Sequence, residues 1–450
     1  MHPIPPRRQR GAVAIMAAIG MLVLLAVVGL VIDGGLAYLV RTRLDAAVDA
    51  AALAGARAVT DGDTQAAQIA SAQAAAGDFF AANIPSSYML SQPQLLSTNV
   101  SFSGGKAIID VRAQALMPLS LMRVLGFTSL TPTSYAQTIR QDLDMAFVVD
   151  TSGSLYSSGP AVRSAAKTFL NQFNVSQDRV AMIHFASGAE VDNAISTSAR
   201  GFNRSSMLNN VNAFNFSGGT ASVEGMWQAR RQLNSIPTAN RSTQRVIVFF
   251  SDGEPTSIAS YLVFNNPYDC TTAGSFDYNA NGLYSLNVSE ATPLGGRCDL
   301  SYPMANSVRK LPDWYNAHNN GGWLYQNDAS QREFPIVTDT PRKVTSDLST
   351  VAAATRNIDR AARNLAEAVA AKARDEGIVV FTLGLGASLK QPSGVDNELG
   401  ENVLKCMANT ADSSCHNPSK PVGMYCFAAT TADLTPCFSK LASAILRISK

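Results

Sequence analysis

The first apolar run of the chain is long enough to cross a membrane. Residues 12–32 contain only apolar side chains and glycine, and Asp33 ends the run. A helix of this length spans about 31 Å, which matches the hydrocarbon thickness of a bilayer. Arg7, Arg8 and Arg10 precede it, so the positive-inside rule places the N-terminus in the cytoplasm and the bulk of the chain outside. A cleaved secretory signal is the alternative, although its apolar region is normally shorter.

Helical periodicity continues beyond this run. Between Leu36 and Ala52 apolar residues recur at helical spacing with arginine and aspartate between them, which predicts an amphipathic stalk. A second alanine-rich stretch covers residues 64–80. We therefore expect the membrane helix to extend outward as a stalk helix.

A small α+β segment is predicted over residues 61–140. Residues 98–102 and 107–113 flank a Ser-Gly-Gly-Lys turn, which is typical of a β-hairpin. The apolar residues 116–127 suggest a short packed helix, and residues 131–140 suggest a further strand.

From Asp142 onward, continuous apolar runs alternate with helical stretches. The runs cover residues 145–149, 179–185, 245–250 and 377–383, and the helical stretches cover 162–170, 223–233, 358–374 and 434–448. Runs of this kind are typical of parallel strands that are covered on both faces. We therefore predict a doubly wound, mostly parallel α/β domain over residues 142–450, with a ligand crevice at the carboxyl ends of its strands.

Five oxygen-bearing side chains fall at that crevice. Asp150 ends the first strand, Ser152 and Ser154 follow in the next loop, Thr220 precedes a helix, and Asp252 ends a later strand. All five are hard oxygen ligands with no Cys or His among them, so the set favours Mg²⁺, with Mn²⁺ or Ca²⁺ as alternatives, over zinc or copper. Taken alone, the segment 150–154 is equally typical of an ordinary helix cap or turn.

Other chemistry finds little support. The four histidines are scattered, and no phosphate-binding glycine motif or nucleophile elbow stands at a strand–helix junction. We expect no enzyme, with a metal-dependent hydrolase using Asp150 and Asp252 as the alternative. A formal net charge of +2 leaves no basic field for nucleic acid. The low charged fraction of 16% fits an apolar segment joined to an exported polar domain.

The cysteines lie in the C-terminal half, at Cys270, Cys298, Cys406, Cys415, Cys426 and Cys437. An even count in an exported chain favours disulfides. We prefer the pair Cys270 with Cys298 because both lie in one insertion, whereas the sequence offers no choice among the other four. The alternative is a zinc site formed between Cys406 and Cys437 with His416, but this stretch contains no C-x-x-C pair.

That insertion covers residues 255–350 and is rich in Asn, Tyr, Gly, Ser and Asp. Its aromatic residues and two cysteines argue against simple disorder. A partner-binding surface and a folded cap over the sheet are equally compatible with this composition. We expect its deletion to alter partner choice while metal affinity stays.

Three separated pieces near the N-terminus, residues 8–14, 31–35 and 44–54, resemble in order the N-terminal region of TadG-like Flp (tight-adherence) pilus-assembly proteins. Type IV pilins carry Glu five residues after a processing glycine. In this chain the residue five positions after Gly11 is Met16. The resemblance therefore implies an anchored accessory protein of the bacterial inner membrane, with residues 1–60 forming a cytoplasmic stub, membrane helix and stalk, and the bulk of the chain periplasmic.

Asp150, Ser152, Ser154, Thr220 and Asp252 match in order the metal-ion-dependent adhesion site of von Willebrand factor A (VWA) domains, which the chain from Asp150 onward resembles. In that family the two serines and the threonine hold Mg²⁺, the aspartates often act through water, and a carboxylate of a partner protein completes the coordination. The resemblance implies non-catalytic capture of an Asp or Glu on a pilus or secretion component. A surface adhesin for host or matrix ligands is the second candidate.

Overall fold

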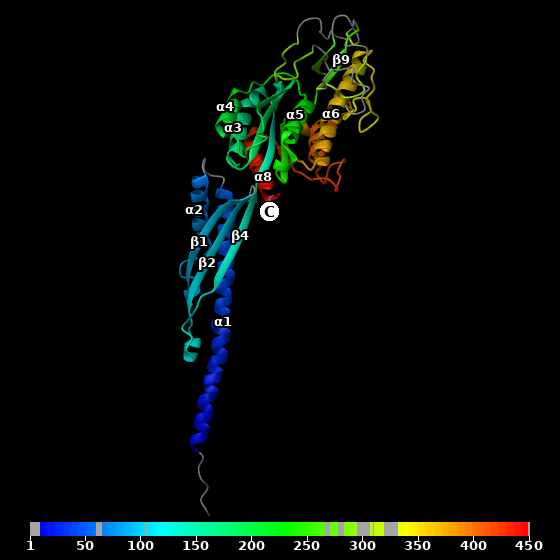
Figure 1. The fold of residues 1–450 in the computed structure, drawn as a ribbon. Helices are drawn as coiled ribbons and strands as arrows, with labels where there is room; N and C mark the ends of the chain where they lie inside the picture. Colours follow the sequence, from blue (N-terminus) through cyan, green and yellow to red (C-terminus); the bar gives the residue numbers. More distant parts are fainter. Residues whose placement is uncertain are drawn as a thin grey trace, which may run out of the picture. The chain divides into compact units, whose positions relative to one another are not determined.

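The computed structural model describes residues 10–59, 65–103, 106–265, 271–277, 283–294, 307–308, 310–318 and 332–448. The chain divides into two compact units, Met1–Arg140 and Gln141–Ser449 (Figure 1). The first contains the apolar helix and a small sheet, and the second contains the alternating strands and helices.

The membrane run and the stalk form one uninterrupted helix, α1 (Arg10–Ala58). Among the described residues it is the one helix long and apolar enough to cross a membrane. The side chains of its apolar run are largely exposed, for example Val13 at 64% and Leu24 at 66%. Burial of such surface away from water is favourable by roughly 25 cal/mol per Å², so an apolar environment outside the chain would stabilise this part of α1.

The C-terminal half of α1 packs on its own sheet instead. The other elements of this unit are α2 (Gln65–Asn83), η1 (Tyr88–Leu90), β1 (Gln92–Ser103), β2 (Lys106–Pro118), η2 (Met122–Leu125), β3 (Ser129–Leu130) and β4 (Thr133–Gln141). β1 and β2 form the predicted antiparallel hairpin, and β3 and β4 also pair with β2. Val40, Leu44 and Val48 of α1 are buried against Ile109 and Val111 of β2.

The predicted packed helix over residues 116–127 is wrong. β2 continues to Pro118, and only Met122–Leu125 forms a 3₁₀ turn, η2. The start of the apolar run forms strand pairs instead of a helix, and Met117 pairs with Leu130 of β3. Leu119 is also buried in the core of this unit, and Met122 packs against that core. Val124, Leu125 and Phe127 stay exposed, so packing inside the chain does not explain the apolar character of residues 124–127.

The second unit contains a six-stranded sheet in the order β14-β11-β8-β5-β6-β7. Its strands are β5 (Leu143–Asp150), β6 (Arg179–Phe185), β7 (Ala189–Asn193), β8 (Gln244–Ser251), β11 (Val379–Leu385) and β14 (Tyr425–Ala428). All neighbours are parallel except β6 and β7. The predicted mostly parallel α/β sheet is confirmed. The short edge strands β7 and β14 were not predicted. β7 has no continuous apolar run, since its sequence is Ala-Glu-Val-Asp-Asn, and β14 is apolar but only four residues long.

Helices cover both faces of this sheet. One face carries α3 (Gly159–Leu170), α4 (Arg204–Ala213) and α8 (Leu434–Ile448), and the other carries α5 (Ser222–Ser235), α6 (Val351–Asp375) and α7 (Gly400–Ala408). In β8, Val246 and Val248 face the first set, whereas Ile247 and Phe249 face the second. Because both faces of β5, β6, β8 and β11 are buried, these four strands appear in the sequence as unbroken apolar runs.

Two disulfides link the last four cysteines, Cys406 with Cys415 and Cys426 with Cys437. Their sulfurs are bonded to each other, so the alternative zinc site in this stretch is not formed. The predicted Cys270–Cys298 pair lies outside the described residues.

The described parts of the insertion pack into the main core. β9 (Ser257–Val263) and β10 (Thr271–Asp277) form an antiparallel pair. Phe276, Ile336 and Leu348 are completely buried in the cluster that also holds the apolar faces of α5 and α6. These residues form a folded cap on the α5–α6 side of the sheet. Deleting the insertion would remove part of the core, so single substitutions are the sharper test of its role.

Candidate functional site

The five predicted side chains come from three loops at one end of the central strands. Asp150 is the last residue of β5, and Ser152 and Ser154 lie at and inside the following 3₁₀ turn, η3 (Gly153–Ser158). Thr220 lies two residues before the start of α5, and Asp252 directly follows β8. β5 and β8 are parallel neighbours, so their carboxyl ends lie side by side.

Hydrogen bonds join four of these residues directly. The Ser154 hydroxyl donates to Asp252 Oδ1 at 2.9 Å and lies 3.1 Å from the Ser152 hydroxyl oxygen. Asp150 accepts the backbone N–H of Ser152 at 2.8 Å and the Ser251 hydroxyl at 2.5 Å. The structure thus brings Asp150, Ser152, Ser154 and Asp252 into one cluster of oxygen atoms.

Thr220 joins this cluster through its loop. The Gly153 N–H donates to the Gly218 carbonyl at 3.1 Å, which holds the two loops against each other. Gly218 has a φ of 91°, and a Cβ there would lie 2.6 Å from the Ser187 hydroxyl oxygen, so only glycine fits this turn. The backbone conformation at Gly218 therefore positions the loop that leads to Thr220, whose side chain is buried.

Three further residues support the site without having been predicted as part of it. One is Ser251, which holds Asp150. The Ser187 hydroxyl accepts the Gly219 N–H at 3.0 Å, and the Thr256 hydroxyl accepts the Thr220 N–H at 3.1 Å. Ser251 could have been found from its position next to Asp252. Ser187 and Thr256 are distant in sequence from the loop they hold, so only the tertiary structure reveals them.

Replacing Thr256 by valine is expected to weaken Mg²⁺ affinity about tenfold, because a buried N–H left without an acceptor costs about 1–3 kcal/mol. The Thr220 loop would relax to satisfy that group and move its hydroxyl. Isothermal titration of the purified protein with Mg²⁺ measures the effect. Thr256→Ser keeps the acceptor and should bind as the wild type does; equal affinity of the valine variant would show that this hydrogen bond does not position the loop.

The two carboxylates carry an electrostatic cost. Burial raises the pKa of Asp150 to about 6, and burial together with the neighbouring Asp150 charge raises the pKa of Asp252 to about 7. Two negative charges in a poorly solvated site disfavour each other, and a divalent cation between them would offset that cost. Among the described residues no group of three or more His, Cys, Asp and Glu side chains could hold a metal. The donors here are two carboxylates and three hydroxyls, a set that fits a hard cation such as Mg²⁺.

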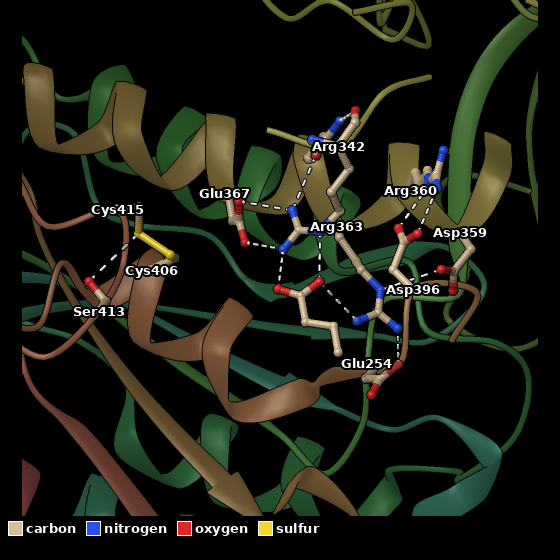
Figure 2. A network of polar contacts seen from close by, with 12 residues as sticks. Glu254, Arg342, Asp359, Arg360, Arg363, Glu367, Asp396, Cys406, Ser413 and Cys415 are labelled. Carbon is tan, nitrogen blue, oxygen red and sulfur yellow. Dashed lines mark hydrogen bonds and ion pairs between the residues drawn. A yellow bond between two sulfur atoms is a disulfide. The ribbon is translucent and has the colours of Figure 1, made fainter. Parts of the chain in front are cut away.

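A buried ion-pair network fixes the chain two residues beyond Asp252 (Figure 2). Glu254 pairs with Arg363 of α6, whose side chain is 1% exposed. Arg363 also lies 3.4 Å from Glu398 and 3.6 Å from Asp359. The loop that carries Asp252 is therefore tied to α6 by charge as well as by the backbone of β8.

Two family models match the chain. Residues 144–265 match the von Willebrand factor type A domain, and residues 11–58 match the Flp pilus-assembly TadE/G-like family. The protein thus carries a VWA domain behind a Tad-like N-terminal segment, as both resemblances predicted. A search of curated proteins found no match.

Similar solved structures include proteins of several kinds. The pilus adhesin SpaC of Lactobacillus rhamnosus GG has 15% identity and a TM-score of 0.39, over 80% of this chain and 34% of its own. The vWF domain of the type V pili tip protein Mfa5 of Porphyromonas gingivalis has 14% identity and a TM-score of 0.38, over 70% of this chain and 98% of its own. Proximal thread matrix protein 1 of the mussel byssus, solved with a zinc-occupied MIDAS motif, has 13% identity and a TM-score of 0.33, over 68% of this chain and 46% of its own.

Proposed function

We propose that this protein is a membrane-anchored, non-catalytic component of Flp (tight-adherence) pilus assembly that captures an acidic side chain of a partner protein through a Mg²⁺-dependent site. One observation carries the proposal: an oxygen cluster at the carboxyl ends of β5 and β8 lies in a VWA domain whose chain begins with a Tad-like segment. The partner is a pilus or secretion component that offers an Asp or Glu.

The hydroxyls of Ser152, Ser154 and Thr220 would hold the cation, with Asp150 and Asp252 acting through water. Mn²⁺ and Ca²⁺ suit the same donors. The bound ion supplies an electrophilic position for a partner carboxylate, because neutral hydroxyls leave its charge largely uncompensated. Ser154 is exposed and Asp150 is completely buried, so the serine side of the cluster is the one that a partner can reach.

Export of the VWA domain is supported by its chemistry. The disulfides Cys406–Cys415 and Cys426–Cys437 are typical of an oxidising compartment such as the periplasm. The exposed apolar part of α1 suits a single membrane span. With Arg7, Arg8 and Arg10 on the cytoplasmic side, we place the protein in the bacterial inner membrane with its bulk in the periplasm.

The proposal is tested by affinity purification of the full-length protein from cells that assemble pili, with chemical crosslinking. We expect pilus components to be captured in Mg²⁺ and to be lost in EDTA and in Ser154→Ala. Ser157→Ala is the matched control, since Ser157 is an exposed hydroxyl in the same turn outside the cluster. Capture that is unchanged in EDTA and in Ser154→Ala would contradict the proposal. Cell fractionation separates it from the surface adhesin, which would leave the inner membrane.

A further inference from the structure

The first unit carries an exposed apolar tip for which the pilus proposal gives no role. Residues 121–130, here called the tip, connect β2 to β3 and include the turn η2. Its large apolar side chains are strongly exposed, at 53% for Val124, 45% for Leu125, 58% for Phe127 and 46% for Leu130. Arg123 is the only charged residue between Arg112 and Arg140. An exposed apolar patch of this kind marks a contact with a partner or a membrane.

The tip is fixed to α1 at the end of the apolar run. The carboxylate of Asp33, itself 2% exposed, accepts the backbone N–H groups of Ser120, Leu121 and Met122 at 3.2, 3.0 and 2.8 Å. These are three consecutive donors at the start of a 3₁₀ turn, where they have no partner within the turn. These contacts give a structural reason for a charged residue at position 33: its carboxylate binds the backbone at the start of the tip.

Gly29 allows the start of the tip to contact α1 within its apolar run, four residues before Asp33. A Cβ on Gly29 would lie 3.1 Å from the Leu121 Cβ and 3.3 Å from its carbonyl carbon, and Gly29 is buried by this contact. Gly29 lies three residues inside the end of the 12–32 run, about 5 Å along the helix axis. η2 accordingly lies beside the apolar part of α1 (Figure 1).

We propose that the tip inserts into the outer surface of the same bilayer that α1 spans, with Val124, Leu125 and Phe127 among the lipid chains and Arg123 at the phosphate groups. The inference rests on the proposed membrane anchoring of α1. If residues 12–32 occupy the hydrocarbon region, then Gly29 lies within it, and the tip that touches Gly29 is at the level of the lipid interface. Apolar side chains with one arginine suit that level, where amphipathic segments bind.

The membrane contact of the tip would give the protein a fixed orientation that a single membrane helix alone does not provide. Packing contacts and interfacial anchors set the tilt and rotation of a membrane span, so a tip that is joined to the span through Asp33 fixes the orientation of the small sheet relative to the membrane. The contact also explains why Val124, Leu125 and Phe127 are apolar without being buried in the chain.

The test is lipid quenching of a tryptophan placed in the tip. Full-length protein carrying Phe127→Trp is reconstituted in vesicles of phosphatidylcholine and phosphatidylglycerol, with and without brominated acyl chains, and its fluorescence is compared with that of the parent chain. Ser101→Trp is the matched control: it is exposed in the same unit but pairs with Ile108, about 30 Å along β2 from the tip. We expect brominated lipid to remove about half of the fluorescence added at residue 127, at the depth typical of interfacial insertion, and none of that added at residue 101.

Alkaline carbonate extraction of the same vesicles tests the anchoring separately. If the protein resists extraction but residue 127 is no more quenched than residue 101, the tip proposal is wrong and the membrane span stands. A blue-shifted Phe127→Trp emission without quenching by brominated lipid would show that protein, such as a second copy or another component, covers the tip, and would also overturn the proposal. Release of the whole chain by carbonate would overturn the anchoring and the tip contact together.

Discussion

Asp150→Asn is expected to abolish Mg²⁺ binding while making the metal-free protein more stable than the wild type. The wild-type carboxylate is completely buried, and burial raises its pKa to about 6, so its ionised form opposes folding unless a cation is bound. The asparagine keeps an acceptor for the Ser152 N–H. Its amide N–H groups can donate to the Ser251 hydroxyl, whose own hydrogen then points to the Gly253 carbonyl 3.2 Å away.

The sign of the effect follows from the direction of the shift. Because the pKa of Asp150 in the folded protein lies above the ordinary value of 3.8, its contribution to stability is complete below about pH 4 and is lost as the pH rises through about 6. The stability gained by Asp150→Asn in EDTA should therefore be larger at pH 8 than at pH 5. Thermal unfolding of full-length protein in detergent measures it.

Mg²⁺ provides the control for this experiment. The wild type should gain thermal stability when Mg²⁺ is added at pH 8, and Asp150→Asn should not, because ligand binding stabilises only a protein with an intact site. An asparagine variant that is less stable than the wild type in EDTA, or that still gains stability from Mg²⁺, would contradict the role assigned to Asp150.

Arg363→Met is expected to destabilise the VWA domain by about 3–5 kcal/mol, the typical cost of leaving buried charges without their partner. The guanidinium lies among Glu254, Asp359 and Glu398 (Figure 2). Its removal leaves Glu254 and Asp359 without this cation, whereas Glu398 keeps its two hydrogen bonds from Arg342. Urea unfolding followed by tryptophan fluorescence measures the change, since all three tryptophans lie in the second unit. Loss of the Glu254 contact should also loosen the loop of Asp252 and weaken Mg²⁺ binding.

Arg360→Met is the matched control, three residues earlier on the same helix. Arg360 also holds a carboxylate in two hydrogen bonds, at 2.8 and 2.6 Å from Asp396, but both side chains are partly exposed. Exposed pairs contribute about 0–1 kcal/mol, so this variant should be nearly neutral. Adding Glu254→Gln to Arg363→Met should recover part of the lost stability. Equal effects at residues 360 and 363 would show that burial does not set the strength of the network.

The residues that hold the candidate site in place were much harder to predict from the sequence than the site residues themselves. Asp150 and Asp252 each stand at the end of an apolar run, so their position next to strands could be predicted. Thr256 and Arg363 stand in no pattern, because a hydrogen bond to a loop 36 residues away or an ion pair 109 residues away leaves no local trace. The same holds for Asp33, whose backbone partners Ser120, Leu121 and Met122 lie 87–89 residues away.

The sequence by itself determined the long apolar helix, the alternating strands and helices of the parallel sheet, and the candidate metal residues at strand ends. Each rests on local periodicity or on burial on both faces, which a run of side chains records directly. Only the tertiary structure decided that the apolar residues 116–127 continue a strand and then enter an exposed tip, that the described insertion is a packed cap, and which of the last four cysteines pair. These depend on which surfaces meet after the chain folds, and hydrophobicity alone does not distinguish a side chain that is buried by the protein from one left for a membrane.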